Sequence, residues 1–148
     1  MMDNQTKLST DEILKDFERG TTPDIKSIDF VKQREQLTQL SCRILEQYKS
    51  KSKFATACEL SQSMLADFLN GKKELSRSKL LGICVTLNYT IQETRDLLHR
   101  LGYPDLYSRN RRDFTILDCI RQGKSLDETN EILWKNGFDD LHDRRPQP

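Results

Sequence analysis

The strongest constraint on the fold is an internal repeat in the second half of the chain. Residues 77–106 align without gaps to residues 112–141, an offset of 35 positions, and 8 of the 30 aligned positions are identical. Such self-similarity predicts one supersecondary unit that occurs twice in succession. The alternative is that two unrelated helix pairs converged on similar residues. The identical pairs are Arg77/Arg112, Cys84/Cys119, Glu93/Glu128, Thr94/Thr129, Leu98/Leu133, Gly102/Gly137, Asp105/Asp140 and Leu106/Leu141.

Each copy of the repeat contains signals that begin and end a helix. A hydroxyl residue followed three positions later by glutamate forms a capping box, in which each side chain binds the backbone N–H of the other residue. A glycine followed by an aromatic residue then stands where a left-handed residue ends a helix. Each copy is therefore predicted to be a helix, a short turn and a second helix. The capping boxes are Thr90 with Glu93 and Ser125 with Glu128, and the glycines are Gly102 and Gly137.

The remainder of the chain is also predicted to be helical, because alternating strand patterns are nearly absent. Thr10 and Gly20 bound a short helix over residues 10–19. Residues 30–49 carry apolar side chains at intervals of three and four, which predicts a helix with one buried face. The fold class is therefore all-α. The apolar residues of the second segment are Leu37, Leu40, Ile44, Leu45 and Tyr48.

Composition narrows the class of protein. Of 148 residues, 35% are hydrophobic and 32% are charged, which excludes collagen-like and fully disordered chains. No apolar run is long enough to span a membrane, and the N-terminus lacks a signal peptide, so we expect a soluble cytoplasmic protein without a membrane partner. The four cysteines are widely spaced, which predicts no metal site. Three of the four fall on apolar helical positions, which predicts buried thiols. No P-loop, GxGxxG, HExxH or nucleophile elbow occurs, so we expect neither catalytic residues nor a cofactor.

Positive charge is concentrated in the middle of the chain. Residues 1–30 hold 4 basic and 7 acidic side chains, for a net charge of −3. Residues 31–82 hold 10 basic and 5 acidic side chains, for +5, whereas residues 83–148 hold 10 and 11, for −1. A polyanion would therefore dock on the middle segment, unless this charge is ordinary solvated surface.

The middle segment contains two short predicted helices within residues 52–73. The first presents Phe54, Ala55 and Cys58 as its apolar face, and Leu60 lies in the turn that follows. Ser61 is a natural N-cap for the second helix, and Asn70 with Gly71 ends it. Two short helices with a small residue at their crossing predict a helix-turn-helix. The core face of the second helix is predicted to be Met64, Leu65, Phe68 and Leu69.

This segment resembles the Xre/Cro-type helix-turn-helix of phage repressors and bacterial regulators. The resemblance covers about residues 34–101 and extends through the helix that follows Ser76. It implies a lambda-repressor-like helical bundle over residues 31–103. An acidic arm with a short helix precedes the bundle at residues 1–30, a helical extension follows at 104–142, and residues 143–148 are predicted to be a disordered tail. The extension is similar to one found on some regulators of this type from Gram-positive bacteria.

The resemblance implies a sequence-specific transcriptional regulator whose second helix enters the major groove of double-stranded DNA. Gln62 is the main candidate for reading bases, because its amide can bind adenine N6 and N7 together. The alternatives are that these polar residues are merely solvated and that the lysines complement a helix dipole. The candidate base-contacting residues are Gln62, Ser63, Ala66 and Asp67. The candidate phosphate-contacting residues are Lys51, Lys53, Asn70, Lys72 and Lys73.

Two acidic residues depart from the family pattern. Glu59 occupies the turn position where family members place a glycine, and Asp67 is expected to face the DNA. Weak binding by one subunit is commonly offset by two-fold pairing, so we expect a homodimer. The extension would form this interface or bind another protein, through exposed anchors such as Tyr107, Trp134 or Phe138, although Trp134 equally fits a core position.

Three alternatives stay open on the sequence alone. The cluster from Arg109 to Arg112 fits either phosphate contacts or caps on helix carbonyls. Residues 1–30 are either an arm that competes with DNA or a helix packed on the body. The competing function is a helical adaptor that uses the same scaffold to bind protein and no DNA.

Overall fold

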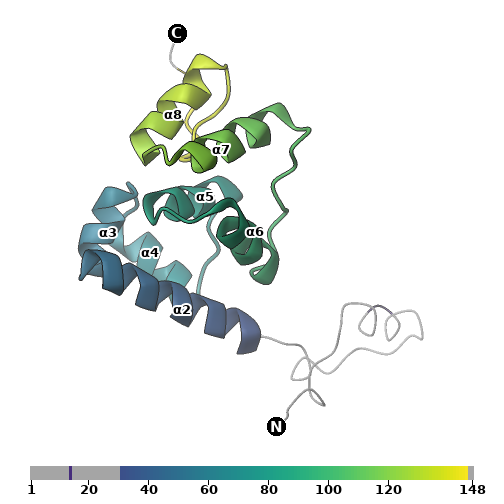
Figure 1. Ribbon diagram of the computed structural model, residues 1–148. Helices are drawn as coiled ribbons and strands as arrows, with labels where there is room; N and C mark the ends of the chain where they lie inside the picture. Colours follow the sequence, from purple (N-terminus) through teal and green to yellow (C-terminus); the bar gives the residue numbers. More distant parts are fainter. Residues whose placement is uncertain (1–13, 15–30, 147–148) are drawn as a thin grey trace.

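A computed structural model describes Leu14 and residues 31–146 of the chain. These residues form an all-α structure with no strand among them (Figure 1). Apart from Leu14, the helix expected over residues 10–19 lies outside the described residues. The helices are α2 (Val31–Tyr48), α3 (Lys51–Ala57), α4 (Gln62–Leu69), α5 (Arg77–Thr86), α6 (Ile91–Arg100), α7 (Arg111–Gln122) and α8 (Leu126–Lys135).

Helix α2 lies along one side of the molecule and packs on α3, α4 and α6 (Figure 1). Leu37, Leu40 and Ile44 are buried, as their spacing predicts, and Tyr48 is partly buried against the ring of Phe54. The prediction that Leu45 joins this face is wrong, because its side chain is 42% exposed. Leu45 follows Ile44 by one position, so a helix of 3.6 residues per turn rotates it about 100° away from the buried stripe.

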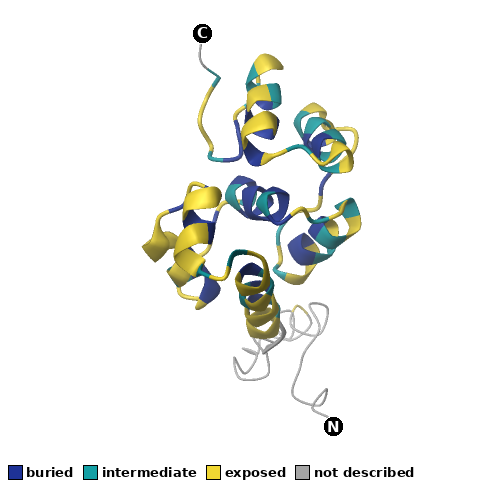
Figure 2. Cartoon of the chain, turned by 60° about the vertical axis from the view of Figure 1, so that its left-hand side comes forward, coloured by how far each residue is buried: buried dark blue, intermediate teal, exposed yellow. Residues whose placement is uncertain are grey.

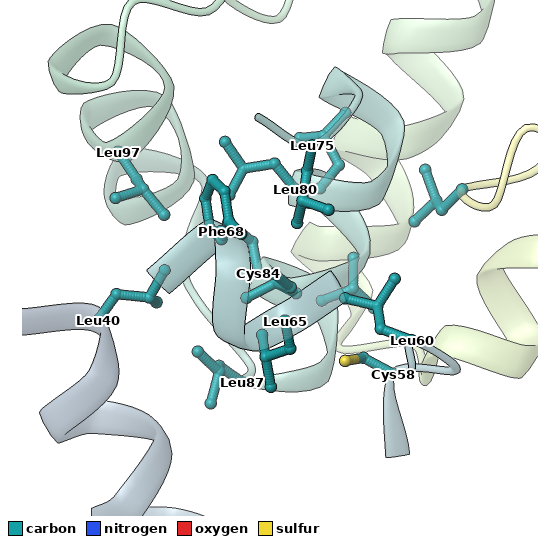
Figure 3. Close-up of a cluster of buried hydrophobic side chains, with 14 of the residues drawn as sticks. Leu40, Cys58, Leu60, Leu65, Phe68, Leu75, Leu80, Cys84, Leu87 and Leu97 are labelled. Carbon is teal, nitrogen blue, oxygen red and sulfur yellow. The ribbon is translucent and has the colours of Figure 1, made fainter. Parts of the chain in front are cut away.

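Helix α5 is the centre of the fold. Figure 2 shows it largely dark blue, with other helices around it, and seven of its ten residues are buried. A helix that is apolar on all sides must be covered on all sides. Helix α4 covers one side, where Leu65 and Phe68 lie beside Cys84 (Figure 3). The extension covers another side, because a Cβ on Gly82 would lie 3.7 Å from the side chains of Leu126 and Leu141.

The two repeat copies have the same local geometry. Both capping boxes are formed, and Gly102 and Gly137 have φ angles of 79° and 80°. The turn inside each copy also passes through a left-handed residue, which is Asn88 in the first copy and Gly123 in the second. These two positions differ by the same offset of 35, so the repeat is structural. It comprises α5 with α6 and α7 with α8.

Buried polar contacts recur at the same offset. The hydroxyl of Thr94 donates to the carbonyl of Thr90 at 2.8 Å, and the hydroxyl of Thr129 donates to the carbonyl of Ser125 at 2.8 Å. Both threonines are fully buried, so each hydroxyl needs an internal partner. The threonine that the two copies share at this position is therefore explained by its buried, hydrogen-bonded place in each copy.

One hydrophobic core runs through the bundle and the extension. Its side chains come both from the bundle (residues 31–103) and from the extension (residues 104–142). The extension contributes Leu106, Ile116 and Leu133, among others. Figure 3 shows the part of this core that lies between α2, α4, α5 and α6. The extension is therefore packed on the bundle. Within the described residues, no helix combines the length and the apolar composition that a membrane crossing requires.

The chain after α8 folds back along the molecule. The carboxylate of Asp140 is fully buried and accepts from the backbone N–H groups of His142 and Arg144. It also accepts from Arg144 Nε at 2.9 Å. Residues 143–148 are predicted as a tail, but the structure describes residues 143–146 and gives two of them side-chain contacts. Asp143 accepts from the hydroxyl of Ser76 at 2.7 Å.

Candidate nucleic-acid interface

Helices α3 and α4 form the predicted pair of short helices. Each begins at a serine N-cap, since Ser50 accepts from the N–H of Lys53 and Ser61 accepts from the N–H of Met64. Phe54, Ala55 and Cys58 are buried, as predicted for the first apolar face. The buried face of α3 therefore anchors this helix in the core, and the Ser61 cap fixes where α4 begins.

The turn between the two helices is a Schellman motif. The N–H of Leu60 donates to the carbonyl of Ala55 at 2.8 Å, and Leu60 is buried beneath the turn. Glu59 has a φ of 57°, in the left-handed region that favours glycine. The backbone geometry expected at this position is confirmed. The cost to a residue with a Cβ is about 1 kcal/mol.

The C-terminal segment holds this turn in place. His142 Nε2 lies 2.8 Å from the carbonyl oxygen of Cys58. A carbonyl only accepts, so Nε2 donates, while Nδ1 lies 3.3 Å from the amide nitrogen of Asn130. Arg144 Nη1 lies 3.5 Å from the carboxylate of Glu59 and offsets its negative charge. A chain segment more than 80 positions away therefore braces the helix-turn-helix.

The first turn of α4 is open to solvent. Gln62, Ser63 and Ala66 are exposed, and Asp67 is half-buried on the same helix. Met64 was predicted to be core, and this is wrong, because its side chain is 38% exposed. It lies in the first turn of α4, where no described element covers it. Leu65, Phe68 and Leu69 are buried as predicted.

Gln62 has a fixed orientation. Its Nε2 donates to the hydroxyl of Ser52 at 2.8 Å, which links the starts of α3 and α4. One amide hydrogen is used in this bond, so the second hydrogen and the carbonyl oxygen stay available for a ligand. Sequence reasoning missed Ser52. The signal available was its position, at the start of α3 between Lys51 and Lys53.

The five candidate phosphate-contacting residues are exposed, two near the start of α4 and three at or after its C-terminal end. Lys51 and Lys53 lie in the first turn of α3, and Asn70 is the C-cap of α4. Lys72 and Lys73 follow Gly71, which has a φ of 74°. The N–H groups of both lysines donate to the carbonyl of Asp67, at 2.8 and 3.3 Å.

Asp67 is partly neutralised within the chain. Its carboxylate lies 4.0 Å from Lys73 Nζ, and both side chains are accessible to solvent. Such a pair is worth little stability, but it lowers the negative potential along α4. Gln33 and Arg34 at the start of α2 line a depression together with Asn70. They are further polar groups at this edge that the sequence pattern did not indicate.

The three arginines of the cluster from Arg109 to Arg112 lie in different environments. Arg112 Nε donates to the carbonyl of Asp139 at 3.0 Å, and Arg112 Nη2 donates to the carbonyl of Asp140 at 3.0 Å. Arg112 therefore binds backbone carbonyls, although these lie in the loop after α8 and not in a helix. Arg109 and Arg111 are exposed.

The three aromatic residues expected as partner anchors, Tyr107, Trp134 and Phe138, differ in how far they are exposed. Tyr107 is 65% exposed. Phe138 is partly buried against the core, and the guanidinium carbon of Arg144 lies 5.6 Å from the centre of the Trp134 ring. Trp134 and Phe138 are therefore engaged within the chain, and Tyr107 alone of the three is largely free.

The thiols are in structural positions. Cys58, Cys84 and Cys119 are buried, which agrees with the three apolar helical positions seen in the sequence, whereas Cys42 is exposed. Burial raises the pKa of Cys58 and of Cys84 to about 12. These two thiols therefore stay protonated at neutral pH. Among the described residues, no three His, Cys, Asp or Glu side chains are grouped to hold a metal ion.

Comparison of the chain with family models, curated proteins and solved structures finds no match. Functional interpretation therefore depends on the geometry of α3 and α4.

Proposed function

We propose that this protein is a sequence-specific, DNA-binding transcriptional regulator with a lambda-repressor-like arrangement of α2 to α6. In this proposal α4 enters the major groove, and its first turn contacts base edges. The observation that carries the proposal is Gln62. Its amide is exposed at the start of α4 and is oriented by Ser52 on the neighbouring helix.

The lysines at the two ends of α4 support the same function. Lys51 lines a depression with Gln62 at the start of α4, Lys53 lies in the same turn of α3, and Lys72 and Lys73 follow the other end of α4. Lysines at such positions bind phosphates and supply most of the affinity, whereas the amide supplies sequence preference. The two acidic departures are each compensated within the chain, Glu59 by Arg144 and Asp67 by Lys73.

The experiment is capture of genomic DNA fragments by the full chain, followed by sequencing and by binding measurements across a salt series. With four lysines near phosphates, of which Lys73 is also held by Asp67, the slope of log K against log salt should be about −3 to −4. Lys72→Glu/Lys73→Glu should weaken binding to every sequence and make the slope shallower by about 1 to 2. Lys124→Glu/Lys135→Glu is the matched control, because it changes the net charge equally beside the two ends of α8.

Gln62→Ala tests sequence recognition separately from affinity. It should reduce discrimination between the captured site and random DNA by about 1–3 kcal/mol, with little change in the salt slope. Undetectable binding at low salt would refute the proposal. It would favour the competing function, a helical adaptor that binds protein alone.

A further inference from the structure

Helix α7 has an exposed face with no partner among the described residues. Phe114 is 60% exposed, and Tyr107, just before the helix, is 65% exposed. The opposite side of α7 carries Ile116 and Cys119, which are buried in the core. Large aromatic side chains left in water beside arginines are typical of interface hot spots.

The exposed face carries charges of both signs in a defined order. Arg111, Phe114 and Asp118 follow one another at spacings of three and four, so they lie along one stripe of the helix. Arg111 stands in the first turn, where the helix dipole disfavours a cation, and no described acidic side chain pairs with it. Asp118 is 42% exposed and accepts from Arg121 and Gln122 within its own helix.

We infer that α7 is a self-association surface whose partner is a second copy of this chain. In an antiparallel pair of α7 helices, the two-fold axis passes between Phe114 and Thr115. This arrangement sets Arg111 of each copy against Asp118 of the other and places the two Phe114 rings at the centre. A two-fold interface requires such self-complementarity. Antiparallel helix dipoles add to it.

Other occupants fit this stripe less well. A DNA duplex would meet the carboxylate of Asp118, which repels phosphate, and the ring of Phe114, which cannot bind phosphate. An acidic peptide would satisfy Arg111 but would meet Asp118 as a like charge. A second copy gives Arg111 an acidic partner, adds a cation beside Asp118, which already accepts from Arg121 and Gln122, and covers the ring of Phe114.

The inference deepens the proposed function, because a two-fold dimer would present two α4 helices to two half-sites. It does not depend on DNA binding, since self-association is measured on the protein alone. A monomer that binds DNA would contradict this inference alone, whereas a dimer that does not bind DNA would contradict the proposed function alone.

The test is sedimentation equilibrium of the full chain, without DNA, over a range of concentrations. The unmodified chain should dimerise, and Phe114→Ala should raise the dimer dissociation constant by about tenfold. Arg111→Glu should also weaken the dimer, because it sets glutamate against Asp118 at two symmetric sites. Arg111→Glu/Asp118→Arg should recover most of the lost affinity, since the pair is rebuilt with its signs exchanged.

Lys135→Glu on α8 is the matched control, because it makes the same charge change away from the stripe. It should leave the dissociation constant unchanged. Unfolding curves of each variant distinguish a weaker interface from a weaker fold. A chain that stays monomeric, or a dimer that survives Arg111→Glu and Phe114→Ala, would overturn the inference.

Discussion

Arg77 and Arg112 make the same two backbone contacts in successive copies of the repeat. Arg77 donates from Nε to the carbonyl of Pro104 at 2.9 Å and from Nη2 to the carbonyl of Asp105 at 2.7 Å. Arg112 donates from the same atoms to the carbonyls of residues 139 and 140. Each arginine therefore ties the first helix of its pair to the loop after the second helix. Arg77 alone also binds a carboxylate, that of Asp113, through two hydrogen bonds of 3.0 and 2.9 Å.

This difference predicts unequal costs for the two arginines. Arg112→Ala removes hydrogen bonds to carbonyls and to Ser78, and we expect a loss of about 1–2 kcal/mol in unfolding free energy. Arg77→Ala also leaves the Asp113 carboxylate without its cation, so we expect about 2–4 kcal/mol. Urea unfolding measures both. Arg121→Ala, which breaks an exposed ion pair, is the control and should cost less than about 1 kcal/mol. Equal costs for Arg77 and Arg112 would contradict this account.

Asp113 should make the free energy of unfolding depend on pH in the acid range. Burial raises its pKa, but hydrogen bonds from Arg77 and from the N–H of Tyr107 outweigh burial, so the pKa is lower than usual. The resulting stabilisation is complete above the pKa of the unfolded chain, about 4. It is lost as the pH falls through the lower folded-state pKa. Asp113→Asn should therefore destabilise the protein at pH 7, and the difference from the unmodified chain should shrink below about pH 4. A constant difference across that range would argue against the ion pair.

The four thiols should react at very different rates. Cys42 is exposed, whereas Cys58, Cys84 and Cys119 are buried, and burial raises the pKa of each of these three. Titration of the native protein with a thiol reagent at mildly alkaline pH should therefore modify one cysteine quickly. The other three should react after denaturation. Cys42→Ser should abolish the fast phase, and a fast phase that persists in this variant would show that a buried position opens readily.

Features set by neighbouring residues could be predicted from the sequence. The capping boxes and the N-cap Ser61 depend on residues within one helical turn, and the structure contains all of them. The left-handed conformation of Glu59 is implied instead by the family resemblance, which places a glycine at this position, and the structure contains it. The repeat could be recognised in the sequence because the same capping signals and the same apolar positions recur 35 residues apart.

Contacts between distant segments could not be predicted in the same way. Nothing in the spacing of the chain links His142 to Cys58 or Gln62 to Ser52. Both contacts depend on how the helices pack, and packing also decides that Met64 is exposed although it is apolar. The exposure of Leu45, by contrast, follows from its position one residue after Ile44. The proposed self-association through α7 likewise depends on which side chains are exposed, and the types of the amino acids alone do not determine this.

The turn at Glu59 offers a test of backbone strain. Glu59→Gly removes the Cβ from a left-handed residue but also removes the ion pair with Arg144. Glu59→Ala loses the same ion pair and keeps the Cβ, so it is the matched control. The glycine variant should be more stable than the alanine variant by about 1 kcal/mol in thermal or urea unfolding. An alanine variant of equal stability would mean that the turn relaxes at no cost.

Asp67 limits the proposed affinity for DNA, and its removal should strengthen binding. Its carboxylate lies 4.0 Å from Lys73 Nζ, so it both repels phosphate and occupies one lysine. Asp67→Asn should raise affinity for random and captured DNA alike, and it should steepen the salt slope by up to about one unit as Lys73 becomes free. The control is Asp127→Asn on α8, an exposed residue away from α4, which should change neither quantity. If Asp67→Asn instead weakened binding to the captured site alone, the carboxylate would be accepting a hydrogen bond from a base, most directly from cytosine N4. Competition between sequences distinguishes these results, because a lost base contact reduces discrimination whereas relief of repulsion does not.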